Sequence, residues 1–367
     1  MRLTAIGLAL SAVLLAGCSG SSAPRVQPTA GNPVSTSPSS AATSLPAALD
    51  WPTYHGTPDR GGAAKTALRG PLHRAWEMHL DAAMYAQPIV AGGVVLAATE
   101  NNSVYAIDLG TGRLRWRVHL ESPARRSDLP CGNIDPSGIT GTPAYDAATR
   151  SVFVVTEGTD ARHTLRALDV ASGHQRWQRN VDVAGARDPL AQQERAALLV
   201  TAGHVYVAFG GRDGDCGNYV GYVAAVPVTG AGAIAHYAVP TAREAGMWAA
   251  AGPVVGPGGD IYVASGNGAE VGGSYDGSDS VIRLSAGLTR KAVFAPRTWR
   301  DDNAQDLDLG SMSPAPVDGK IAIAGKRGTV YLLSPDLGGI GGELSHLDGC
   351  VGFGGAAVSG TIAVMPC

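Results

Sequence analysis

Short runs of apolar residues, separated by turns that contain glycine, recur along most of the chain. Pro88–Leu96 holds two such runs on either side of Gly92-Gly93. Short apolar runs bounded by turn residues are typical of β-strands, so each segment predicts a hairpin. The same pattern occurs six times, in Pro88–Leu96, Pro143–Val155, Ala197–Phe209, Pro253–Ser265, Pro314–Ala324 and Gly355–Met365. The first five of these segments begin 54 to 61 residues apart.

A second motif follows the first two hairpins. Val104–Trp116 and Leu165–Trp177 share the pattern Ala-x-Asp-x-x-(Thr/Ser)-Gly-x-x-x-Trp. The pattern predicts a strand, a tight turn whose glycine accepts a positive φ, and a second strand that carries a large aromatic side chain. Weaker copies without the Asp and Trp occupy Ala224–Gly230, Val281–Leu288 and Val330–Leu337.

Each repeat therefore contains four short strands, which cannot bury both faces of their sheet alone. Radial stacking of such units into a β-propeller buries these faces. We predict an all-β propeller of four-stranded blades, with five complete blades and part of a sixth. The segment Leu72–Leu80 is predicted to supply the outer strand of the last blade.

The Trp-containing pattern resembles the tryptophan-docking motif of pyrroloquinoline-quinone (PQQ)-type β-propellers. Asp50–Gly56 resembles the opening segment of that superfamily, and Cys131–Pro136, Gly214–Gly217 and Phe353–Gly360 resemble stretches of secreted actinobacterial propellers. The resemblance covers residues 50–367. Such proteins commonly have eight blades, so the resemblance implies that this chain is a C-terminally truncated relative.

The N-terminus has the layout of a secretory signal. One positive charge in Met1–Leu3 precedes an apolar stretch, and Leu15–Cys18 resembles the lipobox of bacterial lipoproteins. We expect Cys18 to carry a lipid that anchors the protein to the cell membrane, facing outside the cytoplasm. The alternative is an ordinary signal peptide with a chance cysteine. The expected domains are a signal peptide (1–17), a disordered Ser/Pro/Thr-rich tether (18–49) and a propeller (50–367).

Composition and charge narrow the classes of function. The chain has 50 glycines, which suits a protein dense in turns, and a formal net charge of −3. This charge argues against nucleic-acid binding, because no basic surplus exists to neutralise phosphates. The four cysteines beyond Cys18 allow three pairings into two disulfides, and we favour those between neighbouring repeats. The favoured pairs are Cys131 with Cys216 and Cys350 with Cys367.

The resemblance also suggests site residues. It implies a calcium site formed by Asn267, Glu157 and Asp306, with Asp306 as the base that removes a proton from an alcohol and Lys326 as the contact to the quinone. Asp308 is the second choice for the base. The chain lacks the adjacent cysteine pair of many such dehydrogenases, and their floor tryptophan has no clear counterpart. Blade packing is the expected role of Trp76, Trp116 and Trp177.

Two functions remain open at this point. The favoured interpretation is a binding or scaffolding protein that acts through its loops, without catalysis or cofactor, on a protein or cell-envelope component. Its nearest analogy is the propeller lipoprotein of the outer-membrane assembly machinery. The alternative is a dehydrogenase that uses PQQ and Ca²⁺ to oxidise an alcohol or a sugar.

Overall fold

The computed structural model describes residues 50–64, 70–183 and 187–367. The predicted signal peptide, the predicted lipidation site Cys18 and the predicted tether lie outside the described residues. Every described residue belongs to one compact unit, which spans residues 45–367. Within the described ranges, no helix is both long and apolar enough to cross a bilayer.

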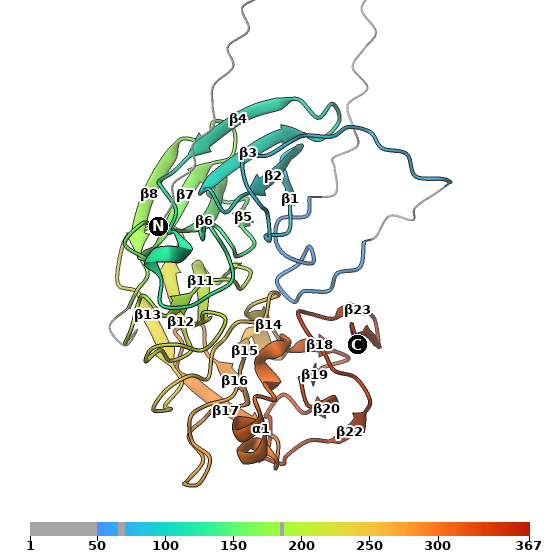
Figure 1. Ribbon diagram of the computed structural model, residues 1–367. Coiled ribbons are helices and arrows are strands. Elements are labelled where there is room, and N and C mark those ends of the chain that lie inside the picture. The colour runs from blue at the N-terminus through green and yellow to red at the C-terminus, as the bar shows by residue number, and fades with distance from the viewer. Residues whose placement is uncertain (1–49, 65–69, 184–186) are drawn as a thin grey trace, which may run out of the picture. The chain divides into compact units, whose positions relative to one another are not determined.

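Five sheets, each with a run of four antiparallel strands, follow one another along the chain (Figure 1). Sheet 1 contains β1 (Ile89–Ala91), β2 (Val94–Ala98), β3 (Ser103–Asp108) and β4 (Leu114–His119). Sheet 2 contains β5 (Ala144–Asp146), β6 (Ser151–Glu157), β7 (His163–Asp169) and β8 (Gln175–Asn180). Sheet 3 contains β10 (Leu199–Thr201), β11 (His204–Gly211), β12 (Tyr222–Pro227) and β13 (Ala235–Ala238), and β9 (Gln192–Gln193) pairs with β11.

Sheets 4 and 5 complete the series. Sheet 4 contains β14 (Val254–Val255), β15 (Ile261–Ser265), β16 (Ser280–Leu284) and β17 (Arg290–Ala295), and β21 (Gly339–Ile340) pairs with β17 in parallel. Sheet 5 contains β18 (Ala315–Val317), β19 (Lys320–Ala324), β20 (Thr329–Leu333) and β22 (Ser345–Asp348). A hairpin of β23 (Ala357–Ser359) and β24 (Ile362–Val364) follows. The predicted arrangement of five complete units and part of a sixth is confirmed. Within the described residues, the helical elements are α1 (Trp299–Gln305) and three 3₁₀ turns, η1 (Arg126–Asp128), η2 (Pro257–Gly259) and η3 (Leu309–Ser311).

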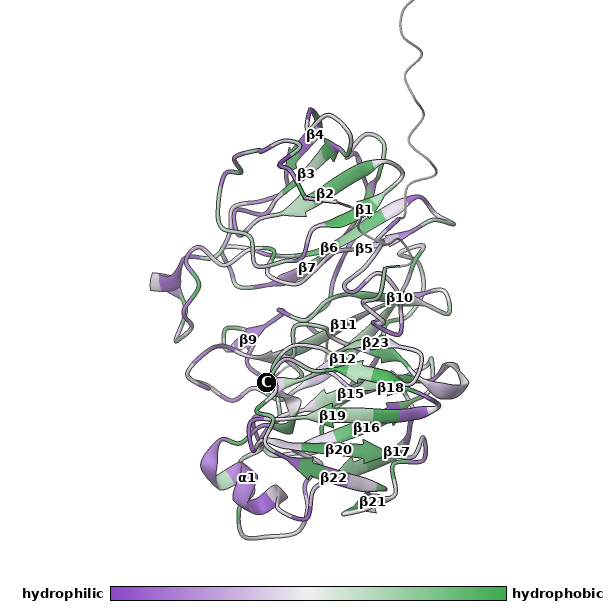
Figure 2. Ribbon diagram, turned by 90° about the vertical axis from the view of Figure 1, so that its right-hand side faces the viewer, coloured by the Kyte–Doolittle hydropathy of each residue, from purple (hydrophilic) through white to green (hydrophobic). Residues whose placement is uncertain are grey.

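The hydrophobic core lies between consecutive sheets. Separate buried clusters join sheet 1 to sheet 2, sheet 2 to sheet 3, sheet 3 to sheet 4 and sheet 4 to sheet 5. A smaller cluster joins sheet 5 to the β23–β24 hairpin. Since an inner sheet is covered on both faces, its middle strands are buried along most of their length, and all seven residues of β6 are buried, polar ones included. Figure 2 shows hydrophobic residues along the strands and hydrophilic residues on α1.

The outer strands alternate instead, because only one of their faces meets a neighbouring sheet. In β4, exposed positions alternate with partly buried ones, and Trp116 points inward. The indole Nε1 of Trp116 donates to the carbonyl of Val170 in the β7–β8 turn of sheet 2, at 3.0 Å. Trp177 makes the same contact with Val228 of sheet 3 (3.2 Å), and Trp76 with Leu109 of sheet 1 (3.0 Å).

Each of these turns holds a glycine under the tryptophan ring. Gly173 has φ +73°, and a Cβ atom built on it would lie 2.6 Å from the ring of Trp116. The turn is stabilised by its aspartate, as in sheet 1, where Asp108 Oδ1 accepts from the amide and the hydroxyl of Thr111. These hydrogen bonds lower the pKa of Asp108 to about 2. The motif therefore combines a capped turn, a positive-φ glycine and a docked indole.

Residues 50–62 run across the inner strands of several sheets. Trp51 pairs with Val90 in β1, and the carbonyl of Pro52 accepts from the amide of Tyr145 in β5. The Thr53 hydroxyl donates to the carbonyl of Leu198, the residue before β10. The carbonyl of Pro58 accepts from the amide of Val255 in β14, and the carbonyl of Gly61 accepts from the amide of Val358 in β23. This opening segment therefore ties the first repeat to later repeats and to the terminal hairpin.

The segment Leu72–Leu80 differs from its prediction as an outer strand of the last unit. It forms no strand in the structure. Its apolar side chains Trp76, Met78 and Leu80 pack on β2 and β3 of sheet 1. The docked indole of Trp76 explains this position, because the indole binds the sheet 1 turn and not the hairpin.

Candidate functional site

The loop between β11 and β12 of sheet 3, the β19–β20 turn of sheet 5 and segments that connect one sheet to the next surround a cavity of about 380 Å³. In a run of four antiparallel strands, the loop between the second and third strands and the connection to the next sheet emerge on the same face, so these segments gather there. The lining of the cavity includes charged side chains of both signs and three aromatic side chains. The lining residues are Arg195, Gly211, Arg212, Asp213, Gly214, Asp215, Tyr219, Trp248, Asp306, Asp308, Lys326 and Phe353.

Lys326 is the central cation of this cavity. Its Nζ lies 2.8 Å from Asp306 Oδ1 and 2.5 Å from Asp308 Oδ2. Burial acts to lower the pKa of Lys326, but the charges and hydrogen bonds of Asp308 and Asp306 together outweigh it and keep that pKa above its ordinary value. The lysine is therefore held as a cation between two carboxylates.

The two aspartates differ in their surroundings. The Asp306 side chain is 64% exposed, and its residue ends α1 in the left-handed conformation, with φ +55°. The Asp308 side chain is only 5% exposed, and its Oδ1 accepts from the backbone amide of Asn267 at 2.8 Å. A Cβ atom on Gly266 would lie 1.8 Å from this carboxylate, so the close approach requires glycine. Asp308, the second choice from the sequence, is the aspartate built into the site.

Trp248 forms an aromatic wall that sequence reasoning missed. Lys326 lies 5.6 Å from the centre of its ring system, and the guanidinium of Arg195 lies 5.7 Å from it. Both distances are in the range of cation–π attraction. Phe353 lies beside Trp248 with a ring separation of 6.4 Å and is 49% exposed. Trp248 follows sheet 3 in a stretch without the repeat motif, so the sequence held no signal for it.

Arg195 is partly buried in the cavity wall. Its Nη2 donates to the carbonyl of Gly211 at 2.8 Å, while its Nε has no partner among the described protein atoms. Burial lowers the pKa of Arg195.

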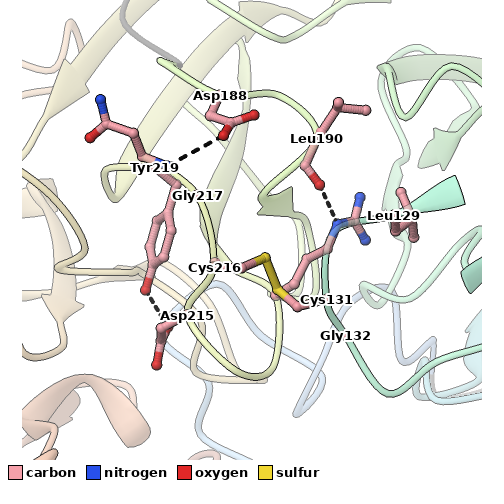
Figure 3. Close-up of a disulfide and its surroundings, with 12 residues drawn as sticks. Leu129, Cys131, Gly132, Asp188, Leu190, Asp215, Cys216, Gly217 and Tyr219 are labelled. Carbon is pink, nitrogen blue, oxygen red and sulfur yellow. Dashed lines mark hydrogen bonds between the residues drawn. A yellow bond between two sulfur atoms is a disulfide. The ribbon is translucent and has the colours of Figure 1, made fainter.

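The Cys131–Cys216 disulfide braces the loop between β11 and β12 (Figure 3). In that loop, Tyr219 donates to Asp215, and the carbonyl of Leu190 accepts from Nε of Arg212. Burial, with Asp215 beside it, raises the pKa of Tyr219 well above its ordinary value. The second disulfide joins Cys350 to Cys367, so both favoured pairings are present in the structure.

Glu157 does not face the cavity as a free carboxylate. It forms a buried ion pair with Arg212, and its Oε2 accepts from the Ser137 hydroxyl at 2.7 Å. Among the predicted site residues, the structure brings Asn267, Asp306 and Lys326 to one place and leaves Glu157 in a separate pair. In the ranges that the structure describes, no three His, Cys, Asp or Glu side chains form a group able to hold a metal ion.

Comparison with known proteins agrees with this architecture. The chain is 28% identical over 249 residues to the quinohemoprotein alcohol dehydrogenase ADH-IIG of Pseudomonas putida, covering 65% of this chain and 31% of that protein. It is 24% identical over 306 residues to a polyvinylalcohol dehydrogenase of a Pseudomonas species, covering 71% of this chain and 44% of that protein. This chain thus spans less than half the length of either relative.

Solved structures show the same fold. The quinohemoprotein alcohol dehydrogenase from Comamonas testosteroni superposes with a TM-score of 0.64 at 20% identity, over 82% of this chain and 50% of that one. Residues 73–278 match the family described as outer membrane protein assembly factor BamB, which is more than half of the chain. The chain is therefore a member of this family of PQQ-type repeat propellers.

Proposed function

We propose that this protein is an extracytoplasmic binding or scaffolding propeller that holds a protein or a cell-envelope component on the loop face around Trp248 and Phe353. The family described as outer membrane protein assembly factor supports a role in the envelope. Cys18 is the proposed site of the lipid anchor. Loops on a rigid support suit recognition, and the exposed ring of Phe353 offers an apolar contact on this face.

The observation that carries this proposal is the internal pairing of the cavity's charges. Glu157, the carboxylate that a calcium ion would need, is neutralised by Arg212. Lys326 is held by Asp306 and Asp308. Calcium needs six to eight oxygen ligands, and the described side chains of this cavity do not fit a quinone bound together with calcium. We therefore derive no reaction step from this site.

One observation favours the second candidate, a quinone-dependent dehydrogenase. Trp248 offers a flat aromatic face with Lys326 and Arg195 above it, a combination that suits a planar anion. Two relatives of this chain are named as dehydrogenases, a quinohemoprotein alcohol dehydrogenase and a polyvinylalcohol dehydrogenase, which supports the same candidate.

Adding PQQ and Ca²⁺ to the full chain separates the two candidates. The binding proposal predicts no saturable quenching of tryptophan fluorescence by PQQ and no alcohol-dependent reduction of a redox dye. Dye reduction that is lost in Asp306→Asn would establish the dehydrogenase instead. Asp318→Asn is the matched control, because Asp318 is also exposed, left-handed and paired with a lysine, Lys320.

A further inference from the structure

Two buried glutamates from different sheets approach one short segment, away from the Lys326 cavity. Glu100 follows β2 in sheet 1, and Glu194 follows β9 in sheet 3. Both lie against residues 138–141, which precede β5 of sheet 2. Glu100 Oε2 accepts from the amide of Gly138 (2.7 Å) and the hydroxyl of Thr140 (3.1 Å). At the other end of the segment, a Cβ atom on Gly141 would lie 2.4 and 2.5 Å from the two carboxylate oxygens of Glu194.

Three side-chain oxygen atoms of the residues around this segment have no donor among the described protein atoms. They are Glu100 Oε1, Glu194 Oε1 and Asn102 Oδ1. The three side chains are almost completely buried, with 1%, 4% and 0% of their residue surfaces exposed, respectively. The side-chain nitrogen of Asn102 donates to the backbone carbonyl of Glu157. The side-chain oxygen of Asn102 lies on the side of Gly138, 2.9 Å from a Cβ atom built on that glycine.

No side-chain cation compensates these carboxylates in the described part of the chain. Burial raises the pKa of Glu100 to about 7, and the nearby carboxylate of Glu157 adds to the effect. Burial raises the pKa of Glu194 as well, and the negative charge of Glu100 adds to it. Arg212, a buried arginine near Glu157, is committed to that residue. The surroundings of the two glutamates thus favour their neutral forms or a bound positive charge.

Protons alone do not satisfy all three oxygens well. The amide oxygen of Asn102 can only accept, and a proton on either glutamate oxygen would itself need an acceptor. A hard cation accepts carboxylate and amide oxygens together. Burial of a carboxylate is expensive unless the charge is paired or coordinated.

We propose that Glu100, Asn102 and Glu194 bind a hard divalent cation of the Ca²⁺ class, with Thr140 beside them. The site holds sheet 1 and sheet 3 together across the segment that leads into sheet 2, so the cation stabilises the fold. It uses two carboxylates and an amide oxygen, and it shares no residue with the Lys326 cavity. The proposal does not depend on the function of that cavity.

Thermal unfolding of the full chain, stripped of metal with EDTA, tests this site. Adding Ca²⁺ at neutral pH is expected to raise the midpoint by about 5 °C, because a ligand that binds only the folded state stabilises it. Glu194→Gln and Glu100→Gln should remove this response. Asp308→Asn, which alters the other cavity, should retain it. A wild-type midpoint that does not respond to Ca²⁺, or a response that survives in Glu194→Gln, would overturn the proposal.

Infrared spectroscopy of the wild-type protein keeps the test independent of how the variants fold. Calcium binding should reduce the carbonyl stretch of protonated carboxyl groups at neutral pH, with one Ca²⁺ retained per chain after dialysis. A band that Ca²⁺ leaves unchanged would mean that the two acids keep their protons, and the cation site would be rejected.

Discussion

Arg212 and Glu157 form an ion pair in which each side chain is almost completely shielded from water. Nε of Arg212 also donates to the carbonyl of Leu190, and the Ser137 hydroxyl donates to Glu157. Removing one member of such a pair leaves an uncompensated buried charge, which costs more than the pair itself contributes. The pair therefore holds Arg212 in place in the wall of the cavity and engages the Glu157 carboxylate, which a metal ion would require as a ligand.

We predict that Glu157→Gln lowers the free energy of unfolding by about 3–5 kcal/mol. The double variant Glu157→Gln/Arg212→Met should recover part of this loss, because the remaining charge is removed with its partner. Urea unfolding followed by tryptophan fluorescence measures both. A single variant within about 0.5 kcal/mol of wild type, the range of an ordinary surface substitution, would show that the pair is not buried in solution.

At this scale the sequence predicted only part of the site. Lys326, Asp306 and Asn267 could be placed because they lie in segments with a recognisable resemblance. The pairing of Glu157 with Arg212 could not be predicted, because Arg212 is 55 residues away and follows a strand of another sheet. Trp248 and Arg195 were missed, since tertiary contacts and no local pattern bring them to the cavity.

The docked tryptophan is the recurring element that joins one sheet to the next. Its indole both donates a hydrogen bond and covers a glycine turn, so the turn and the outer strand of the preceding sheet depend on each other. The motif was readable from the sequence because Asp, Gly and Trp have separate local roles. The copies without Trp could be found only through their spacing, and they form strands nonetheless.

Gly173→Ala and Gly203→Ala provide a matched test of this docking. Both glycines have nearly the same φ (+73° and +74°), but a Cβ atom on Gly203 would contact nothing within 4 Å. Gly203→Ala should cost about 1–2 kcal/mol for the left-handed backbone. Gly173→Ala should cost a further 1–3 kcal/mol or so, because its Cβ atom overlaps Trp116.

The extra cost of Gly173→Ala should disappear when Trp116 is itself replaced by alanine. Denaturant unfolding of the four variants supplies the comparison. Equal losses for the two glycine variants in the wild-type background would mean that the indole does not pack on this turn in solution.

In the whole described unit, contacts between residues far apart in the sequence hold the series of sheets together. Residues 50–62 cross the inner strands, and buried Arg60 donates from this segment to the carbonyls of Tyr54 and Leu198. The number of repeats was predictable from their spacing. The path of the opening segment was not, because several of its contacts are backbone hydrogen bonds, which carry no residue-specific signal, and the acceptors of Thr53 and Arg60 are distant backbone carbonyls.

The central claim is that the protein binds a partner on the face around Trp248 and Phe353. A photo-crosslinking residue at Phe353, in the full chain within its own envelope, tests this claim most directly. Leu114 on β4 is the control position, since its exposed fraction is the same, 49%. The account predicts a crosslinked product at Phe353 that is lost with Trp248→Ala and is absent at Leu114. No product at Phe353, or the same product from both positions, would contradict it.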